Sequence, residues 1–170
     1  MTFLADSRKV LGAMSLLAFA AFGFALFSQH VLGMAPCAWC VLQRMVCLAI
    51  GVVAGAAWLS RRQMGATLAI ALVFVLSIGG MLAAWYQRTV AANLFSCDLT
   101  LADRIVTASG LDRMAPPIFG VFATCAESAV HLLGVRYEVW TLLLFGVMAA
   151  ASLAALITRI RSTAIRLQPH

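Results

Sequence analysis

Five cysteines are the residues of this chain whose types and spacing could do chemistry. Cys37 and Cys40 form a Cys-x-x-Cys pair, Cys97 and Cys125 stand singly further along the chain, and Cys47 lies inside an apolar stretch. Cysteine thiols can pair as structural disulfides, bind zinc, or pass electrons through successive disulfides. The spacing and surroundings of each cysteine bear on the choice between these three chemistries.

The Cys-x-x-Cys spacing favours redox exchange. A disulfide between Cys37 and Cys40 would close a very short loop, so it would gain little chain entropy as a staple. Stapling suits Cys97 and Cys125 better, because their disulfide would close a long loop. Zinc stays an alternative, although the later cysteines are not a second closely spaced pair. We expect Cys47 to be a small packing residue.

The residues next to the pair suit a reactive thiol. Pro36 precedes the pair and an apolar stretch follows it, so both cysteines should lie at or just before the N-terminus of a helix. The helix dipole there favours a thiolate. Arg44 follows Cys40 by four residues, one helical turn further on the same face, where it could stabilise a thiolate or hold a ligand oxygen. We interpret Trp39 as an interfacial membrane anchor.

The elements that must position these residues are membrane spans. The chain has 170 residues, of which 64% are hydrophobic and 11% charged, whereas soluble domains carry about 25% charged residues. A spanning helix needs about 20 mostly apolar residues, and the hydrocarbon core admits no open backbone. We therefore predict an all-α membrane protein, a bundle of four transmembrane helices in one domain, with spans at about residues 10–32, 41–60, 63–87 and 139–158.

Basic residues near the span ends predict the orientation. Seven of them, against Asp6 alone, fall on the side of the termini and of the short 61–62 turn: Arg8, Lys9, Arg61, Arg62, Arg159, Arg161 and Arg166. We expect that side to be cytoplasmic. The two cysteine-bearing loops, at about 33–40 and 88–138, should face outward. A cleaved leader is the alternative for the first stretch, and it would also leave the cysteines outside. The basic residues are too dispersed for a nucleic-acid site.

The outer loop between the later cysteines carries two further patterns. Residues 98–110 are typical of a short amphipathic helix, with Leu101 and Ile105 on one face. Residues 115–119 are apolar and contain two prolines, from which we expect an extended stretch. Both would suit a loop that lies on the membrane surface, and a small self-packed loop is the alternative.

The residues around the cysteines resemble those of the DsbB family, the quinone-linked disulfide-forming oxidoreductases of bacterial inner membranes. The number of spans, the topology and the loop sizes agree as well, so the resemblance covers nearly the whole chain. Three segments carry it: Gln29-His30-Val31-Leu32-Gly33-Met34-Ala35-Pro36-Cys37-Ala38-Trp39-Cys40-Val41-Leu42-Gln43-Arg44, Phe95-Ser96-Cys97-Asp98 and Cys125-Ala126-Glu127.

The resemblance implies a role for each outer cysteine. Cys97 and Cys125 resemble the pair that takes electrons from DsbA, a soluble periplasmic protein of thioredoxin fold, with Cys97 forming the mixed disulfide. Cys37 and Cys40 resemble the membrane-proximal pair that regenerates the loop disulfide. A Cys37–Cys125 bond corresponds to the intermediate between the loops, and Cys40 to the thiolate that contacts quinone. At rest, this scheme implies Cys37–Cys40 and Cys97–Cys125 disulfides and a reduced Cys47.

The resemblance also implies a quinone, ubiquinone or menaquinone, and no metal. Arg44 matches the family's quinone-site arginine. Arg88 stands where well-known members carry a histidine, so we expect it to approach the quinone without transferring protons. One rival is an enzyme similar to vitamin K epoxide reductases, although that family carries its membrane-proximal Cys-x-x-Cys late in the bundle. The other is a four-span scaffold with a stapled outer loop, which has no need of a Cys-x-x-Cys pair beside Arg44.

The orientation can be tested with a membrane-impermeant thiol reagent on intact, reduced spheroplasts. We expect the reagent to label Cys37, Cys40, Cys97 and Cys125, because the excess of basic residues places them outside. Labelling that requires lysis of the cells would contradict the orientation and the function that depends on it.

Overall fold

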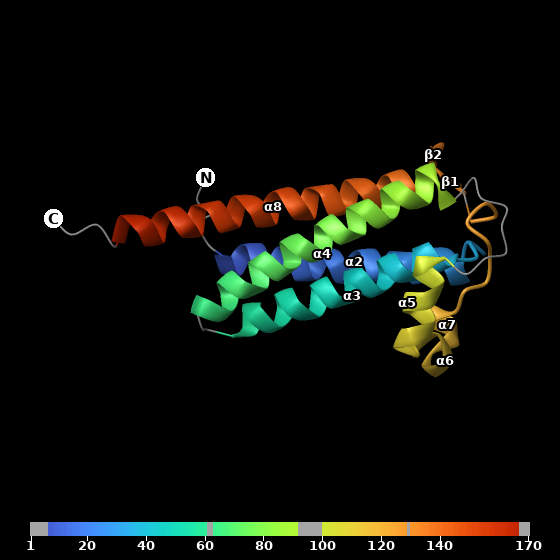
Figure 1. Ribbon diagram of the computed structural model, residues 1–170, viewed down its shortest axis with the longest axis horizontal. Coiled ribbons are helices and arrows are strands. Elements are labelled where there is room, and N and C mark those ends of the chain that lie inside the picture. The colour runs from blue at the N-terminus through green and yellow to red at the C-terminus, as the bar shows by residue number, and fades with distance from the viewer. Residues whose placement is uncertain (1–6, 61–62, 92–99, 129, 167–170) are drawn as a thin grey trace.

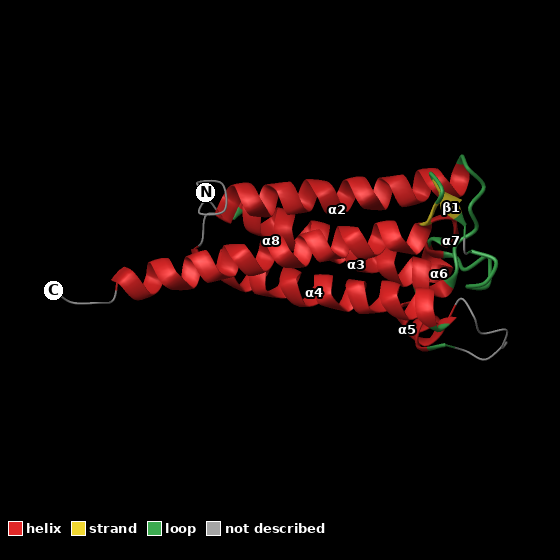
Figure 2. Cartoon of the chain, turned by 90° about the horizontal axis from the view of Figure 1, so that it is seen from above, coloured by secondary structure: helices red, strands yellow, loops and turns green. Residues whose placement is uncertain are grey.

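The computed structural model describes residues 7–60, 63–91, 100–128 and 130–166. Four long helices hold most of them: α2 (Ser7–His30), α3 (Ala38–Leu59), α4 (Gln63–Thr89) and α8 (Tyr137–Arg166). Three short helices and an antiparallel hairpin lie between α4 and α8, namely α5 (Leu101–Ser109), α6 (Leu111–Met114), α7 (Pro116–Phe119), β1 (His131–Leu132) and β2 (Val135–Arg136). The long helices lie side by side, and the short elements gather at one end of them (Figures 1 and 2).

Each long helix contains a segment that is long and apolar enough to cross a membrane, within residues 7–30, 38–59, 65–89 and 137–161. The four predicted spans are confirmed, with boundaries that differ by a few residues. The difference at α3 affects the site, because this helix begins at Ala38 and so includes Cys40 in its first turn. The start of α2 and the end of α8 lie at the same end of the bundle, opposite the short elements (Figure 1).

The packing of the four helices is uneven. Helix α4 packs along α8, α2 packs along α3, and α3 joins the two pairs by packing against α4. Helices α2 and α8 touch each other much less. The bundle is therefore closed on three sides and looser on the fourth, between its first and last spans.

The residues inside and outside the bundle are both apolar. Leu11, Ile50 and Ile70 are fully buried where the helices meet, whereas Leu16 and Leu68 leave 73% of their surface exposed. A soluble protein would cover its outer face with polar side chains, but here the acyl chains of the lipid are the solvent. This arrangement gives the high hydrophobic content of the chain a physical reason.

The outer loop departs from the sequence-based expectation in one segment. Helix α5 forms within the predicted range 98–110, of which residues 98–99 lie outside the described residues, with Thr100 and Asp103 in a capping box and Gly110 in the left-handed conformation at its end. Residues 116–119, predicted to be extended, form the helical turn α7 instead, with proline in its first turn. Proline is compatible with the start of a helix because its missing N–H has no partner there and its φ is already helical.

The interpretation of Trp39 as a membrane anchor is also wrong. Its side chain is 7% exposed and packs in a cluster with Cys37, Ala38, Ala83, Ala91 and Ala102. Its ring lies against that of Tyr86, with the centroids 4.9 Å apart. The bulk of the indole fills the space between α3 and α4 next to the Cys-x-x-Cys pair, so burial among small residues outweighs the preference of tryptophan for the interface.

Two adjacent glycines of α4 offer a matched test of this packing. A Cβ atom on Gly80 would lie 2.6 Å from Phe145 Cε1, and Phe145 is fully buried, whereas a Cβ atom on Gly79 would meet nothing within 4 Å. We expect Gly80→Ala to destabilise the protein by about 1–3 kcal/mol, because overpacking forces side chains off their rotamers. Gly79→Ala should be neutral or slightly stabilising. Thermal unfolding in detergent measures both, and equal melting temperatures would contradict the packing.

Candidate functional site

The Cys-x-x-Cys pair lies at the N-terminus of α3, as the sequence predicts. Cys37 is the N-cap residue, with extended backbone, and its carbonyl accepts the N–H of Val41 at 3.0 Å. The sulfur atoms of Cys37 and Cys40 are 3.1 Å apart, and both are free thiols. A disulfide brings its sulfurs to about 2.05 Å, so a small side-chain rotation would allow this pair to close.

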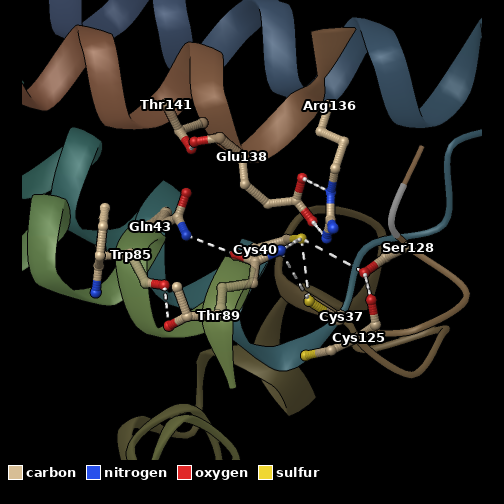
Figure 3. A network of polar contacts seen from close by, with 11 residues as sticks. Cys37, Cys40, Gln43, Trp85, Thr89, Cys125, Ser128, Arg136, Glu138 and Thr141 are labelled. Carbon is tan, nitrogen blue, oxygen red and sulfur yellow. Dashed lines mark hydrogen bonds and ion pairs between the residues drawn. The ribbon is translucent and has the colours of Figure 1, made fainter. Parts of the chain in front are cut away.

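Backbone hydrogen bonds attach the outer loop to this pair. The N–H groups of Phe122 and Ala123 both donate to the carbonyl of Pro36, at 3.0 and 3.3 Å. The chain then makes a turn in which Thr124 and Glu127 bond to each other reciprocally through their side chains and backbone N–H groups. Cys125 lies within this turn. The loop is therefore fixed to the residue that precedes Cys37, and Cys125 is placed against Cys37 (Figure 3).

The contact between Cys37 and Cys125 makes the two thiols unequal. The neighbouring Cys37 thiol lowers the pKa of Cys125 below its ordinary value. The same interaction, together with burial, raises the pKa of Cys37 to about 11. The thiolate is the nucleophile in disulfide exchange. Cys125 is therefore the more nucleophilic member of this pair, and Cys37 is the sulfur next to it.

Three polar side chains surround the sulfurs. The hydroxyl of Ser128 donates to the carbonyl of Cys125 at 3.2 Å and accepts the thiol of Cys40 at 4.0 Å. Gln87 Nε2 lies 3.3 Å from Cys40 Sγ and 3.7 Å from Cys37 Sγ. Gln87 Oε1 accepts Gln43 Nε2 at 2.7 Å. Figure 3 shows Cys37, Cys40, Cys125 and Ser128 close together, with Gln43 beside them.

A cavity of about 440 Å³ begins at Cys40 and runs into the membrane-spanning region. It lies where α2 and α8 are loosely packed, with α3 behind it. Most of its lining is apolar, including Leu17, Phe24, Leu144 and Phe145. The thiols of Cys40 and Cys47 also reach it. Cys47 is buried in the core, as expected for a packing residue.

Arg44 lines the same cavity and is held from two sides. Its Nη2 donates to the carbonyl of Ala25 in α2 at 3.0 Å, and its Nη1 donates to the carbonyl of Ile118 in α7 at 3.2 Å and to Gln29 Oε1. The side chain is 7% exposed, so it does not extend to the surface as an interfacial anchor. Among the described residues, no carboxylate forms an ion pair with Arg44, and its three acceptors leave two of the five guanidinium N–H groups for a ligand.

The structure brings together four of the six predicted site residues: Cys37, Cys40, Cys125 and Arg44. Cys97 lies outside the described residues. Arg88 is exposed and is not part of the cavity wall, so the structure does not bring it to Arg44. The sequence reasoning missed the Gln43–Gln87 pair. Its signal was a polar side chain inside each of two apolar stretches, where such residues are costly and tend to face the bundle interior.

The chain is similar to known proteins along most of its length. Residues 7–155 match the model of the family described as disulfide bond formation protein DsbB. Disulfide bond formation protein B of Ralstonia nicotianae is 31% identical over 158 residues, which cover 92% of this chain and 98% of that protein. Disulfide bond formation protein B 1 of Pseudomonas putida is 36% identical over 141 residues, covering 81% and 83% of the two chains. With four spans, a thiol pair opening the second of them and a family match along most of its length, this chain belongs to the DsbB family.

Proposed function

We propose that this chain takes two electrons from a reduced, DsbA-like thioredoxin-fold protein of the periplasm and passes them to a quinone in the bacterial inner membrane. The observation that carries the proposal is the position of the Cys37–Cys40 pair: Cys125 contacts it from the outer loop, and Cys40 reaches the apolar cavity. The relatives named disulfide bond formation protein B support the same reaction. The cysteine end of the bundle then faces the periplasm, and the two termini lie in the cytoplasm.

The energetics require such an oxidant. A DsbA-type dithiol has a reduction potential of about −120 mV, so its reduced form is favoured and it is hard to reoxidise. A glutathione pool at roughly −200 mV cannot drive that reoxidation. A lipid-soluble quinone is a stronger oxidant, and the enzyme must then offer thiols to water and an apolar cavity to the membrane.

The route of the electrons that we propose is the one that the family resemblance implies, and the contact of Cys125 with the thiol pair supports it. The partner's thiolate attacks Cys97 of a Cys97–Cys125 disulfide, forming a mixed disulfide and releasing Cys125 as a thiolate. Cys125 then attacks Cys37 of the Cys37–Cys40 disulfide and releases Cys40 as a thiolate. Each exchange forms one S–S bond and breaks another. Cys125 packs against the cluster that contains Cys37, and this contact places the two sulfurs for the second exchange.

The cavity suits a quinone such as ubiquinone or menaquinone. Its apolar walls would take the ring and the start of the isoprenoid tail, and a remaining N–H group of the Arg44 guanidinium would donate to a quinone oxygen. A quinone bound there supplies the acceptor for two electrons and two protons. Arg44 also places a positive charge beside the cavity that Cys40 reaches, where it stabilises negative charge as Cys40 ionises.

The inequality of the thiols predicts the order of their alkylation. In the reduced protein at pH 7, iodoacetamide should modify Cys125 well before Cys37, because a thiol with a pKa of about 11 is thiolate for only roughly one part in ten thousand at that pH. Cys37→Ala should slow the reaction of Cys125, since the neighbouring thiol that lowers its pKa is lost. Cys37→Ser keeps a donor and should restore it. Mass spectrometry of timed samples measures each site, and equal rates for Cys37 and Cys125 would contradict the assignment.

The role of Arg44 can be measured by steady-state quinone reduction in detergent, with reduced DsbA as the electron donor. A hydrogen bond to a charged group contributes about 1.5–3 kcal/mol, so Arg44→Ala should lose roughly tenfold to a hundredfold in quinone kcat/KM. Arg44→Lys should be intermediate, because it keeps the charge and loses the planar fork.

Two controls separate the quinone site from the thiol relay. Arg104→Ala removes an exposed arginine of α5, away from the cavity, and should leave quinone kinetics unchanged. Cys97→Ala should abolish reaction with DsbA while the Cys37–Cys40 pair stays oxidisable by quinone. Wild-type quinone kinetics in a folded Arg44→Ala variant would remove Arg44 from the quinone site.

A further inference from the structure

Two glutamine side chains form a buried pair beside the reactive thiols. Gln43 comes from α3 and Gln87 from α4, and they are 5% and 2% exposed. Gln43 Nε2 donates to Gln87 Oε1 at 2.7 Å. Burying two amides next to a membrane-spanning core is costly unless their hydrogen bonds are satisfied. The pair therefore needs a reason beyond packing.

The hydrogen bond between the two amides fixes which end of Gln87 faces the sulfurs. An amide has one oxygen that accepts and one NH₂ group that donates. Because Gln43 occupies Gln87 Oε1, the NH₂ group of Gln87 is directed at Cys40 Sγ, 3.3 Å away, and at Cys37 Sγ, 3.7 Å away. The NH₂ group of Gln87 therefore points at the two sulfur atoms.

A donor at this place stabilises the charged form of a thiol. A thiolate accepts hydrogen bonds, and in a site with little water those bonds must come from the protein. Among the described residues, the side chains that form hydrogen bonds with Cys40 Sγ are those of Cys37, Ser128 and Gln87. Cys37 loses its own proton during the redox cycle, and the Ser128 hydroxyl already donates to the Cys125 carbonyl. Of these three side chains, only Gln87 donates through an NH₂ group, which is present whatever the protonation state of the site and does not depend on the rotation of a hydroxyl.

We propose that Gln87 is a catalytic residue that donates to the thiolate of Cys40 when the Cys37–Cys40 disulfide opens, and that Gln43 is a positioning residue that orients Gln87. The proposal rests on the proposed function, in which Cys40 is the thiolate that meets quinone. Gln43 also lines the cavity. The pair therefore spans the distance between the cavity wall and the sulfurs, and it contacts the thiols on the side of α4.

The test measures the ionisation of Cys40 without quinone or partner. The protein carries Cys37→Ser, Cys47→Ala, Cys97→Ser and Cys125→Ser, so that Cys40 is the one thiol, and the rate of its alkylation by iodoacetamide is followed against pH by mass spectrometry. Loss of a hydrogen bond to a charged group should move the pH midpoint of the rate upward by about one to two units in Gln87→Leu. At neutral pH that is roughly tenfold to a hundredfold slower alkylation.

Three further variants separate donation from packing. Gln87→Glu has nearly the same shape but presents a carboxylate, which accepts and repels a second negative charge, so its midpoint should rise at least as far as that of Gln87→Leu. Gln43→Leu should give a smaller rise, because the amide of Gln87 is still present but no longer oriented. Ser77→Ala removes a buried hydroxyl of α4 that bonds Val73 O, far along the helix from the thiols, and should change nothing.

Circular dichroism and thermal unfolding check that each variant folds, and if Gln87→Leu does not, the nearly isosteric Gln87→Glu decides the outcome. Unchanged midpoints in the folded Gln87 variants would overturn the proposal. Failure of the proposed function is a different result, in which the wild-type chain does not reduce quinone with DsbA while the alkylation midpoints still shift. A midpoint that moves in Ser77→Ala as far as in Gln87→Leu would reduce Gln87 to a packing residue and would also overturn the proposal.

Discussion

The carbonyl of Pro36 is the acceptor on which the geometry of the thiol site depends. Two backbone N–H groups of the outer loop, from Phe122 and Ala123, end on this single oxygen. It belongs to the residue immediately before Cys37, so the loop is held at the point where the thiol pair begins. Cys125 follows Ala123 by two residues and can reach Cys37 without a long search by a free loop. Because backbone groups make these bonds, the attachment does not depend on the oxidation state of any cysteine.

The membrane imposes the second constraint, which is that polar groups inside the bundle must be satisfied by the protein. Arg44 meets this requirement by bonding to α2, to α7 and to Gln29, so its charge joins the wall of the cavity to the outer loop. The helices α2 and α8 are loosely packed beside it. A cavity between them can admit an apolar molecule from the lipid, whereas the tightly packed pairs α2 with α3 and α4 with α8 hold the site in place.

The sequence was enough to predict the spans and the place of the thiol pair on its helix, because apolar run length and Cys-x-x-Cys spacing are local signals. That Cys125 meets Cys37 was implied by the family resemblance alone. It could not predict contacts that depend on how helices turn against each other. Gln87 and Arg88 are adjacent, and one residue rotates a helix by about 100°, so one faces the sulfurs and the other is exposed. Trp39 was misplaced for the same reason, since burial against Tyr86 is a tertiary contact.

The surroundings of the thiols differ in a way that bears on the proposed relay. In the reduced protein, the Cys37 thiol lowers the pKa of Cys125, whereas burial and the Cys125 thiol raise the pKa of Cys37 to about 11. Once Cys125 has bonded to Cys37, the sulfur left without a partner is Cys40, and the Gln87 amide already faces it. In the proposed relay, negative charge thus moves from the loop to the sulfur that reaches the cavity, where the Gln87 amide is present before the charge arrives. Electrostatic preorganisation of this kind needs no large movement of the helices during turnover.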